Sequence, residues 1–591
     1  MRGRMIAAIA VAGLVSLAAA GWLVLSPRWA VGYLQQQAQA QLGRKLSVKG
    51  GASLSFSPLA IRIDGASLAG QGNEAESVLT MGSLVIPVTF ADLLTHDASL
   101  SKVTLERAEF ALLIDERGQA SWDVPEASLP DGMSVTLEDA SIRYFDIRNA
   151  QSLSMGGLDG ILDAGADGGL GFKGTAVMNG RIVRIDAALK SLPRVNADGS
   201  PLDLAIEAPE AKATFSGRIS TARVLSLTGP MSLVSPDPAA SMRWAGISIP
   251  EGITIAGPVN IDGGLDSAGR AFAVRGAALT VGGFRGAGDV VLDLRAEVPK
   301  LQAALRTPFL ALDSFLPSSG AKPGEWGRTR IAFGLLKSFD AEIEIETDAL
   351  GLVELKTGPA RVTAKLSGGM LESVGSAQLA EGGSLSFGAT ADATVLPPAI
   401  SASVKVGNAA LAPLANATGI GFLSGIGSFS ASVAASGLTQ EEMVGTLKGE
   451  ARIDLAQGQF AGTSAADLFS GVRRQVIEGW GAPTGNTPFT SLAADATISD
   501  GILAIGQFAL DAPDLTLTLT GGIDLLRRAL DLRASPRLKT AGPDGATALP
   551  VPIVVHGSWE APRIYPDVPN LLKDPNVGYE ALGQMAPPSG N

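Results

Sequence analysis

The stretch Ala341-Glu342-Ile343-Glu344-Ile345-Glu346 alternates apolar and acidic side chains without interruption. Successive side chains of a β-strand point to opposite faces of a sheet, so this period of two is typical of a strand with one dry and one wet face. The glutamates must face water. The alternation therefore predicts that Ala341, Ile343 and Ile345 point to the interior.

The same parity rule applies at two other places, far apart in the chain. Ile61 and Ile63 alternate with Arg62 and Asp64, which predicts that both isoleucines point inward. Near the C-terminus three leucines alternate with threonines, and the inward positions there are Leu515, Leu517 and Leu519. With Ile343 and Ile345, these residues are the candidates for lining an apolar interior.

Turn signals are dense between such stretches, and helical signals are few. Asp-Gly and Asn-Gly pairs supply the positive φ that tight hairpins require. They begin at Asp64, Asp131, Asp159, Asp167, Asp198, Asp262, Asp500, Asp544 and Asn179. The clearest hairpin joins residues 496–499 to 502–505, and helical spacing occurs only at 29–42, 91–94, 310–316 and 464–478. We expect a mainly β protein with small helical plugs and, because no compositional linker divides it, one continuous sheet.

The apolar faces of so many strands need a cover, and the sequence offers few helices to supply one. The sheet must therefore curl on itself or hold lipid. A filled β-sandwich core satisfies the same alternation, and the pattern does not separate the two solutions.

The N-terminal segment is a predicted membrane anchor. Residues 5–25 are uncharged and long enough, at ~1.5 Å per residue, to cross a ~30 Å hydrocarbon core. Arg2 and Arg4 precede the segment, which favours an inside N-terminus and an exported body. The anchor residues include Met5, Leu14 and Leu25, with Trp22 and Trp29 as interfacial aromatics. A signal peptide cleaved near residues 18–20 is the alternative, and it also exports the body.

Composition excludes most catalytic chemistry. Lys and Arg number 46 against 58 Asp and Glu, a net charge of -12 that opposes nucleic-acid binding. There is no cysteine, and only His96 and His556 remain for acid-base work. A Gly-x-Gly-x-x-Gly match at 169–174 is followed by a strand pattern instead of a helix, and 163–168 lacks the acidic twelfth ligand of a calcium loop. We therefore expect no enzyme, no cofactor and no metal site.

Motifs at both ends resemble the AsmA family. The N-terminal motifs are Gly43–Val48, Leu54–Leu59, Ile61–Leu68, Val103–Ala108 and Asp115–Gly118 followed by Trp122. The C-terminal motifs are Gly449–Gly462, Thr487–Phe489, Ala512–Leu515, Gly521–Leu525, Leu549–Pro552 and His556–Pro562. Their order along the chain carries the resemblance, since no single motif is specific.

The resemblance implies an inner-membrane protein of diderm bacteria whose body lies in the periplasm and forms an elongated, twisted, taco-like β-groove. It divides the chain into a cytoplasmic N-terminus at residues 1–4, an anchor at 5–26, an N-terminal β region at 27–345, a C-terminal β region at 346–570 and a loosely ordered tail at 571–591.

For function, the resemblance implies phospholipid movement between inner and outer membranes, with acyl chains in the groove. The alternative is an assembly factor that pairs its strands with outer-membrane proteins and carries no lipid. The expected partners are phospholipid acyl chains, the inner membrane, and outer-membrane or periplasmic proteins.

Overall fold

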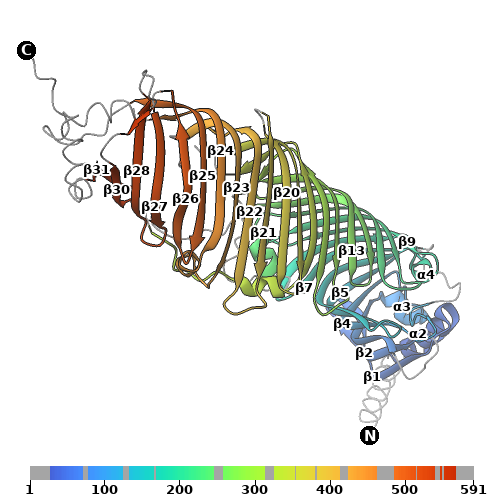
Figure 1. Ribbon diagram of the computed structural model, residues 1–591. Coiled ribbons are helices and arrows are strands. Elements are labelled where there is room, and N and C mark those ends of the chain that lie inside the picture. Colours follow the sequence, from blue (N-terminus) through green and yellow to red (C-terminus); the bar gives the residue numbers. More distant parts are fainter. Residues whose placement is uncertain are drawn as a thin grey trace, which may run out of the picture. The chain divides into compact units, whose positions relative to one another are not determined.

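The computed structural model (Figure 1) describes residues 27–70, 77–123, 132–165, 168–244, 257–312, 325–352, 355–379, 382–412, 423–461, 485–513, 515–539, 546–548 and 552–567. The chain forms two compact units. Unit 1 comprises Met1–Ile249 and Thr254–Gly283, and unit 2 comprises Pro250–Ile253 and Phe284–Asn591. Both are mainly β, as the alternation predicts.

The described residues of unit 1 contain four helices and strands that pair in chain order. The helices are α2 (Arg28–Leu42), α3 (Phe90–Thr95), α4 (Leu192–Val195) and α5 (Pro238–Trp244). The strands are β1 (Leu46–Phe56), β2 (Leu59–Ala69), β3 (Ser77–Pro87), β4 (Lys102–Ile114), β5 (Met133–Asp146), β6 (Gln151–Ala164), β7 (Leu170–Met178), β8 (Arg181–Leu189), β9 (Ser200–Glu207), β10 (Lys212–Ser220), β11 (Ser226–Ser235), β12 (Val259–Ala268) and β13 (Ala271–Val281). Every neighbouring pair is antiparallel except β4 and β5, which run parallel.

The first two helices form where the sequence predicts them and cover the start of this sheet. Helix α2 ends at Gly43, whose left-handed φ of 63° suits a residue without a Cβ. Helix α3 begins with a capping box between Thr89 and Asp92. Ala30 and Leu34 of α2 and Leu93 of α3 belong to the same buried cluster as Ile61 and Ile63 of β2, so the helices plug this part of the apolar face (Figure 1).

Unit 2 consists mainly of strands, with one short α-helix, α7 (Gln440–Gly445), and one 3₁₀ helix, η2 (Phe333–Lys337), among the residues that the structure describes. Its strands are β14 (Phe284–Asp293), β15 (Lys300–Thr307), β16 (Leu310–Ala311), β17 (Asp340–Thr347), β18 (Leu350–Leu352), β19 (Leu355–Ser367), β20 (Met370–Leu379), β21 (Ser384–Asp392), β22 (Ala399–Ala410), β23 (Leu423–Ser436), β24 (Lys448–Ala461), β25 (Asn486–Ser499), β26 (Ile502–Asp511), β27 (Leu515–Asp524), β28 (Ala529–Lys539), β29 (Ala546–Ala548), β30 (Ile553–Ser558) and β31 (Arg563–Pro566).

Most strands of unit 2 pair with the next strand in the chain, but four pairs skip one strand. The pairs β15–β17 and β16–β18 are parallel, whereas β17–β19, β28–β30 and the consecutive pairs are antiparallel. The predicted hairpin at 496–505 is confirmed: β25 and β26 meet at Asp500 and Gly501, whose φ angles of 49° and 75° are both positive.

Several local predictions are wrong. Leu310 and Ala311, expected to begin a helix, form β16, because a parallel partner is available to their backbone in β18. The Asp-Gly pairs at Asp64, Asp159 and Asp262 lie inside strands beside register shifts, since a bulge favours turn-like residues too. His556, expected to begin a turn, lies within β30.

Three further expectations stay predictions. The first is the division between residues 345 and 346, both of which belong to β17. The helix expected at 464–478 and the anchor at 5–25 lie outside the described residues. Among the residues that are described, no helix combines the length and the apolar character needed to cross a membrane.

Candidate functional site

One face of the unit 2 sheet is apolar across its whole width. Following the pairing register from β15 to β31, a single row of facing residues contains no polar side chain. That row runs Leu305, Ile345, Val362, Gly375, Phe387, Val404, Ala431, Ala451, Ala496, Ile505, Gly521, Leu532, Val555 and Ile564. We call the face that carries this row the apolar face of unit 2.

One of the two neighbouring rows, shifted by one residue, is polar from β15 to β25. It runs Arg306, Glu346, Arg361, Ser376, Ser386, Lys405, Ser430, Arg452 and Asp495. Because adjacent residues of a strand point to opposite faces, this row lies on the other side of the sheet. The sheet of unit 2 is therefore amphipathic from strand to strand, with its wet side held by ion pairs such as Arg361 with Glu346.

Burial in unit 2 follows the alternation over most of β17. Ala341 is buried and Ile343 and Ile345 are half-buried, whereas Glu342 and Glu344 are exposed; Glu346, at the end of the stretch, is half-buried like Ile345. In β27, Leu515 is buried, and Leu517 and Leu519 are half-buried. In unit 1 the outcome differs, because Ile61 and Ile63 are fully buried under α2 and α3.

Large side chains in the middle of the apolar face remain half-buried. Examples are Phe387, Val404, Phe429, Ile453 and Phe508, all of which pack at the margin of the buried cluster of unit 2. Pairing links the described strands of this unit into one sheet. A contiguous apolar surface of this kind, only partly covered, is typical of a binding surface.

Phenylalanine rings lie over glycines on these sheets, a feature that the sequence analysis missed. A Cβ built on Gly375 would overlap the ring of Phe387, and one on Gly458 would overlap that of Phe489. The same arrangement occurs within strands, where Phe and Gly stand two apart, at Phe172-Gly174, Phe215-Gly217 and Phe284-Gly286. The recurring Phe-x-Gly spacing is the signal that predicts it. Rings that lie flat cover the glycine backbone and keep the apolar surface shallow.

A second, smaller apolar feature lies in unit 1 beneath α2. It is a pocket of about 190 Å³ between the C-terminal half of α2 and the ends of β1 to β5. Its lining is Leu34, Gln37, Ala38, Leu42, Leu46, Leu68, Leu79, Met81, Leu84, Leu100, Val103, Leu105, Met133 and Val135. We call it the α2 pocket. No regular alternation marks these residues in the sequence, and only the positions on α2 and the strands together show that they converge.

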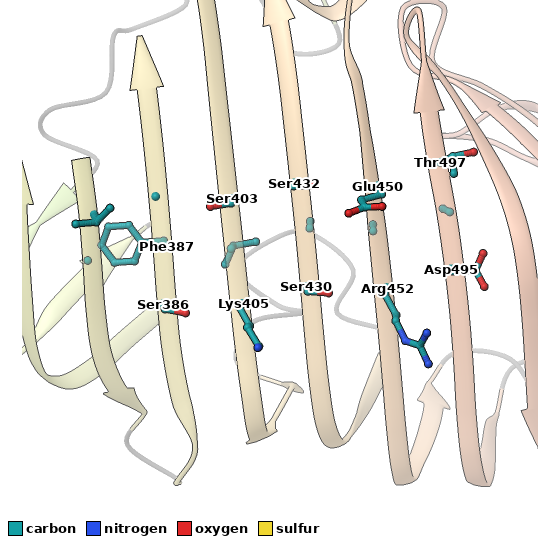
Figure 2. A pocket seen from close by; sticks show the side chains of 17 residues that line it. Ser386, Phe387, Ser403, Lys405, Ser430, Ser432, Glu450, Arg452, Asp495 and Thr497 are labelled. Carbon is teal, nitrogen blue, oxygen red and sulfur yellow. The ribbon is translucent and has the colours of Figure 1, made fainter. Parts of the chain in front are cut away.

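A wide hollow of about 760 Å³ extends over β20 to β25 of unit 2 (Figure 2). Residues of both rows line it: the apolar row contributes Gly375, Phe387, Val404, Ala431, Ala451 and Ala496, and the polar side chains include four serines with Lys405, Glu450, Arg452 and Asp495. Arg452 donates to Asp454 at 2.8 Å, and this hydrogen bond raises the pKa of the guanidinium. The described residues contain no cluster of His, Cys, Asp and Glu able to hold a metal ion.

Charged networks in unit 1 stabilise its polar side. Arg62 donates to Glu106 and, at 2.6 Å, to Ser83, and its hydrogen bond to Glu106 lowers the pKa of that carboxyl. Asp146 is fully buried and accepts hydrogen bonds from Arg148, which lowers its pKa. These groups form hydrogen bonds with one another, and none of them lines a cavity described here.

The predicted membrane residues divide into two sets. Trp29 is described: its ring packs edge-on against His96, with 5.1 Å between ring centroids, and so rests on the body of unit 1. This packing occupies part of the ring that the sequence assigned to the membrane interface. The other four lie outside the described residues: Met5, Leu14, Trp22 and Leu25.

Comparison with protein families identifies the N-terminal part of the chain. Residues 1–129 match the AsmA family. The matched segment contains α2, α3 and β1 to β4, so the AsmA resemblance of the N-terminal motifs is confirmed, and it includes the α2 pocket except for Met133 and Val135. The resemblance of the C-terminal motifs to AsmA proteins stays a prediction. Neither the curated proteins nor the solved structures contain a match to this chain.

Proposed function

We propose that this protein is anchored in the inner membrane, extends into the periplasm, and conducts phospholipids between the inner and outer membranes along its apolar sheet faces. The observation that carries the proposal is the unbroken apolar row of unit 2, which passes from β15 through β17 and β19 to β28, while a row beside it is polar from β15 to β25. The AsmA match of residues 1–129 supports the same reading.

The physical basis is the cost of moving an acyl chain through water. Each methylene exposed to water costs about 0.8 kcal/mol, so a chain of about 16 carbons meets a barrier on the order of 12 kcal/mol. A surface that offers apolar contacts at every strand spacing of about 4.8 Å removes most of this barrier step by step. The polar headgroup stays in water at the margin of the face.

The chain has no catalytic role in this proposal. Its two histidines lie in unrelated settings: His96 packs on Trp29, and His556 stands on β30 with Nδ1 at 3.9 Å from Asp531. Neither is joined to a second acid-base group in a cavity, which is what general acid-base catalysis requires.

The alternative, strand pairing with outer-membrane proteins, receives little support from the described edges. β31, which pairs with β30, has only four residues and ends at Pro566, which has no N–H to donate. The outer side of β1 is approached by α2, where Gln35 donates to the Leu46 carbonyl at 3.1 Å.

Photo-crosslinking at two neighbouring positions tests the proposal. A photoreactive residue at Ile343 stands on the apolar face, whereas one at Glu344 stands on the polar face of the same strand. In cells, phospholipid adducts are expected at Ile343 and not at Glu344. Equal labelling of both positions, or adducts to polypeptide in place of lipid at Ile343, would refute lipid conduction.

A further inference from the structure

The α2 pocket has the lining of a site for a hydrocarbon chain. Apart from Gln37, every residue around its 190 Å³ is apolar, and the residues come from one helix and five strands. A site with so few polar partners holds ordered water poorly, whereas a dry apolar cavity of about 150 Å³ is large enough to bind benzene. The pocket therefore favours an apolar guest over water.

The size of the pocket matches the end of one acyl chain. At about 30 Å³ for a group of water size, 190 Å³ holds about six methylenes. Removing six methylenes from water favours occupancy by on the order of a thousandfold. The pocket is too small for a whole phospholipid.

The floor of the pocket continues into the apolar face of unit 1. Val135 of the lining pairs with Leu162, and Leu162 pairs with Phe172. The same row then passes through Ala187, Leu204, Phe215 and Met231. These side chains are apolar from β5 to β11, so a hydrocarbon chain that leaves the pocket meets no polar step on that side of the sheet.

Helix α2 covers the pocket, and it follows the predicted anchor directly in the chain. The helix begins at Arg28, three residues after the last residue of the 5–25 segment. Its C-terminal end is fixed by Arg44, which donates to the carbonyls of Ala69, Ser121 and Asp123 at 2.7–3.2 Å. Leu34 and Ala38, between these two ends, cover the pocket.

We propose that the α2 pocket binds the terminal methylenes of one phospholipid acyl chain and is the place where lipid from the inner membrane first contacts the sheet. This inference rests on the proposed lipid conduction and names its starting point. Its occupant is hydrocarbon of membrane lipid, bound tail first, with the headgroup outside the pocket.

Crosslinking in the full chain, in its own membrane, tests the site. The probe is p-benzoylphenylalanine at Leu79, a half-buried lining residue, with Thr80, which points to the opposite face, as the matched control. Phospholipid adducts are expected to be at least about tenfold more abundant at Leu79 than at Thr80.

A pocket-filling variant adds a second measurement. With the probe moved to Met133, Leu79→Trp is expected to lower lipid adducts about tenfold by occupying the volume, and Thr80→Trp to leave them unchanged. If Leu79→Trp does not accumulate, the comparison of Leu79 with Thr80 in the otherwise unaltered chain decides the matter.

The outcomes separate this inference from the proposed function. Lipid adducts at Ile343 but none at Leu79 would overturn the α2 pocket and leave lipid conduction standing. Polypeptide adducts at Leu79 would show that a protein segment fills the pocket, which also overturns the inference. Absence of lipid at both Leu79 and Ile343 would overturn both proposals.

Discussion

At the scale of single residues, the contact between Gly375 and Phe387 shows how the apolar face is kept shallow. The two residues pair across β20 and β21, and the ring of Phe387 lies where a side chain on Gly375 would stand. Glycine is required here by close approach and not by its φ angle. Its absence of a Cβ lets a large aromatic ring cover backbone without rising from the sheet.

Gly375→Ala is expected to displace the Phe387 ring and to destabilise unit 2 by about 1–3 kcal/mol, because the new methyl group overpacks the site. Hydrogen exchange of the β20 and β21 amides measures this loss. The control is Gly388→Ala in β21, where the nearest side-chain atom, Ser403 Oγ, is 3.3 Å from the added Cβ. Equal hydrogen-exchange protection of the wild type and Gly375→Ala would show that the position of the Phe387 ring does not depend on a glycine at 375.

At the scale of elements, residues 325–340 form a strap across the turns at one end of the unit 2 strands. Trp326 donates from Nε1 to the Leu525 carbonyl at 3.0 Å in the β27–β28 turn. Ile331 N donates to the Leu438 carbonyl at 2.9 Å beside α7, and η2 then reaches β19 and β20 before β17 begins. One segment thus contacts strands that lie far apart in the sheet.

The length of this strap constrains the sheet. From Trp326 to Asp340, with five residues in a 3₁₀ turn, the chain reaches at most about 41 Å. The strands from β17 to β28 are ten spacings apart, which is about 48 Å if the sheet is flat. The indole of Trp326 and its 3.0 Å hydrogen bond add to this reach, so the strap crosses these strands either nearly extended or over a curved sheet.

The guanidinium of Arg528, which lies between two indole rings, fixes the first residues of the strap. The guanidinium of Arg528 lies 4.6 Å from the Trp326 ring and 5.3 Å from the Trp559 ring. Arg328 also pairs with Glu441 of α7 at 2.7 Å. Contacts from three separate parts of the chain meet here.

Trp326→Ala is expected to release this end of the strap at a local cost of about 1–2 kcal/mol, the range of a partly desolvated cation–π contact. Limited proteolysis should then cut between residues 325 and 340, a region protected in the wild type. Trp326→Phe is the matched control, because it keeps a ring over Arg528 and loses only the indole hydrogen bond. An unchanged cleavage pattern in the Ala variant would mean that the strap is held without Trp326.

At the scale of the whole molecule, lipid conduction and a packed core predict opposite results for a charge on the apolar face. Leu517 is half-buried on this face, and Thr518 is exposed on the other. Leu517→Asp is expected to abolish function with the protein still abundant, because a carboxylate on the path costs a passing acyl chain several kcal/mol. Complementation of a deletion strain, together with immunoblotting, measures both properties.

Thr518→Asp serves as the control and should complement fully. If Leu517→Asp instead removes the protein, the side chain belongs to a tightly packed interior, where an unpaired charge unfolds its surroundings. If Leu517→Asp complements as well as Thr518→Asp, acyl chains do not pass this position.

The sequence by itself determined the mainly β character of the chain and the alternation of apolar and polar side chains along several strands. Alternation at 341–346 and 515–520 reports the environment of each residue directly, because the period of two is a local property of the strand. The same holds for α2 and for the Asp500-Gly501 hairpin, whose signals lie within a few residues. The resemblance of the N-terminal motifs to the AsmA family was also recognisable from the sequence, and the family match covers residues 1–129.

Only the tertiary structure decided what the dry sides contact. Ile61 and Ile343 have the same pattern, yet Ile61 is sealed under α2 and α3 while Ile343 stays half-buried. The parallel pairs β4–β5 and β15–β17, the strap at 325–340 and the α2 pocket join residues whose partners lie tens to hundreds of positions away. Alternation along one strand carries no information about which distant segment covers it, because burial is set by the partner and not by the strand.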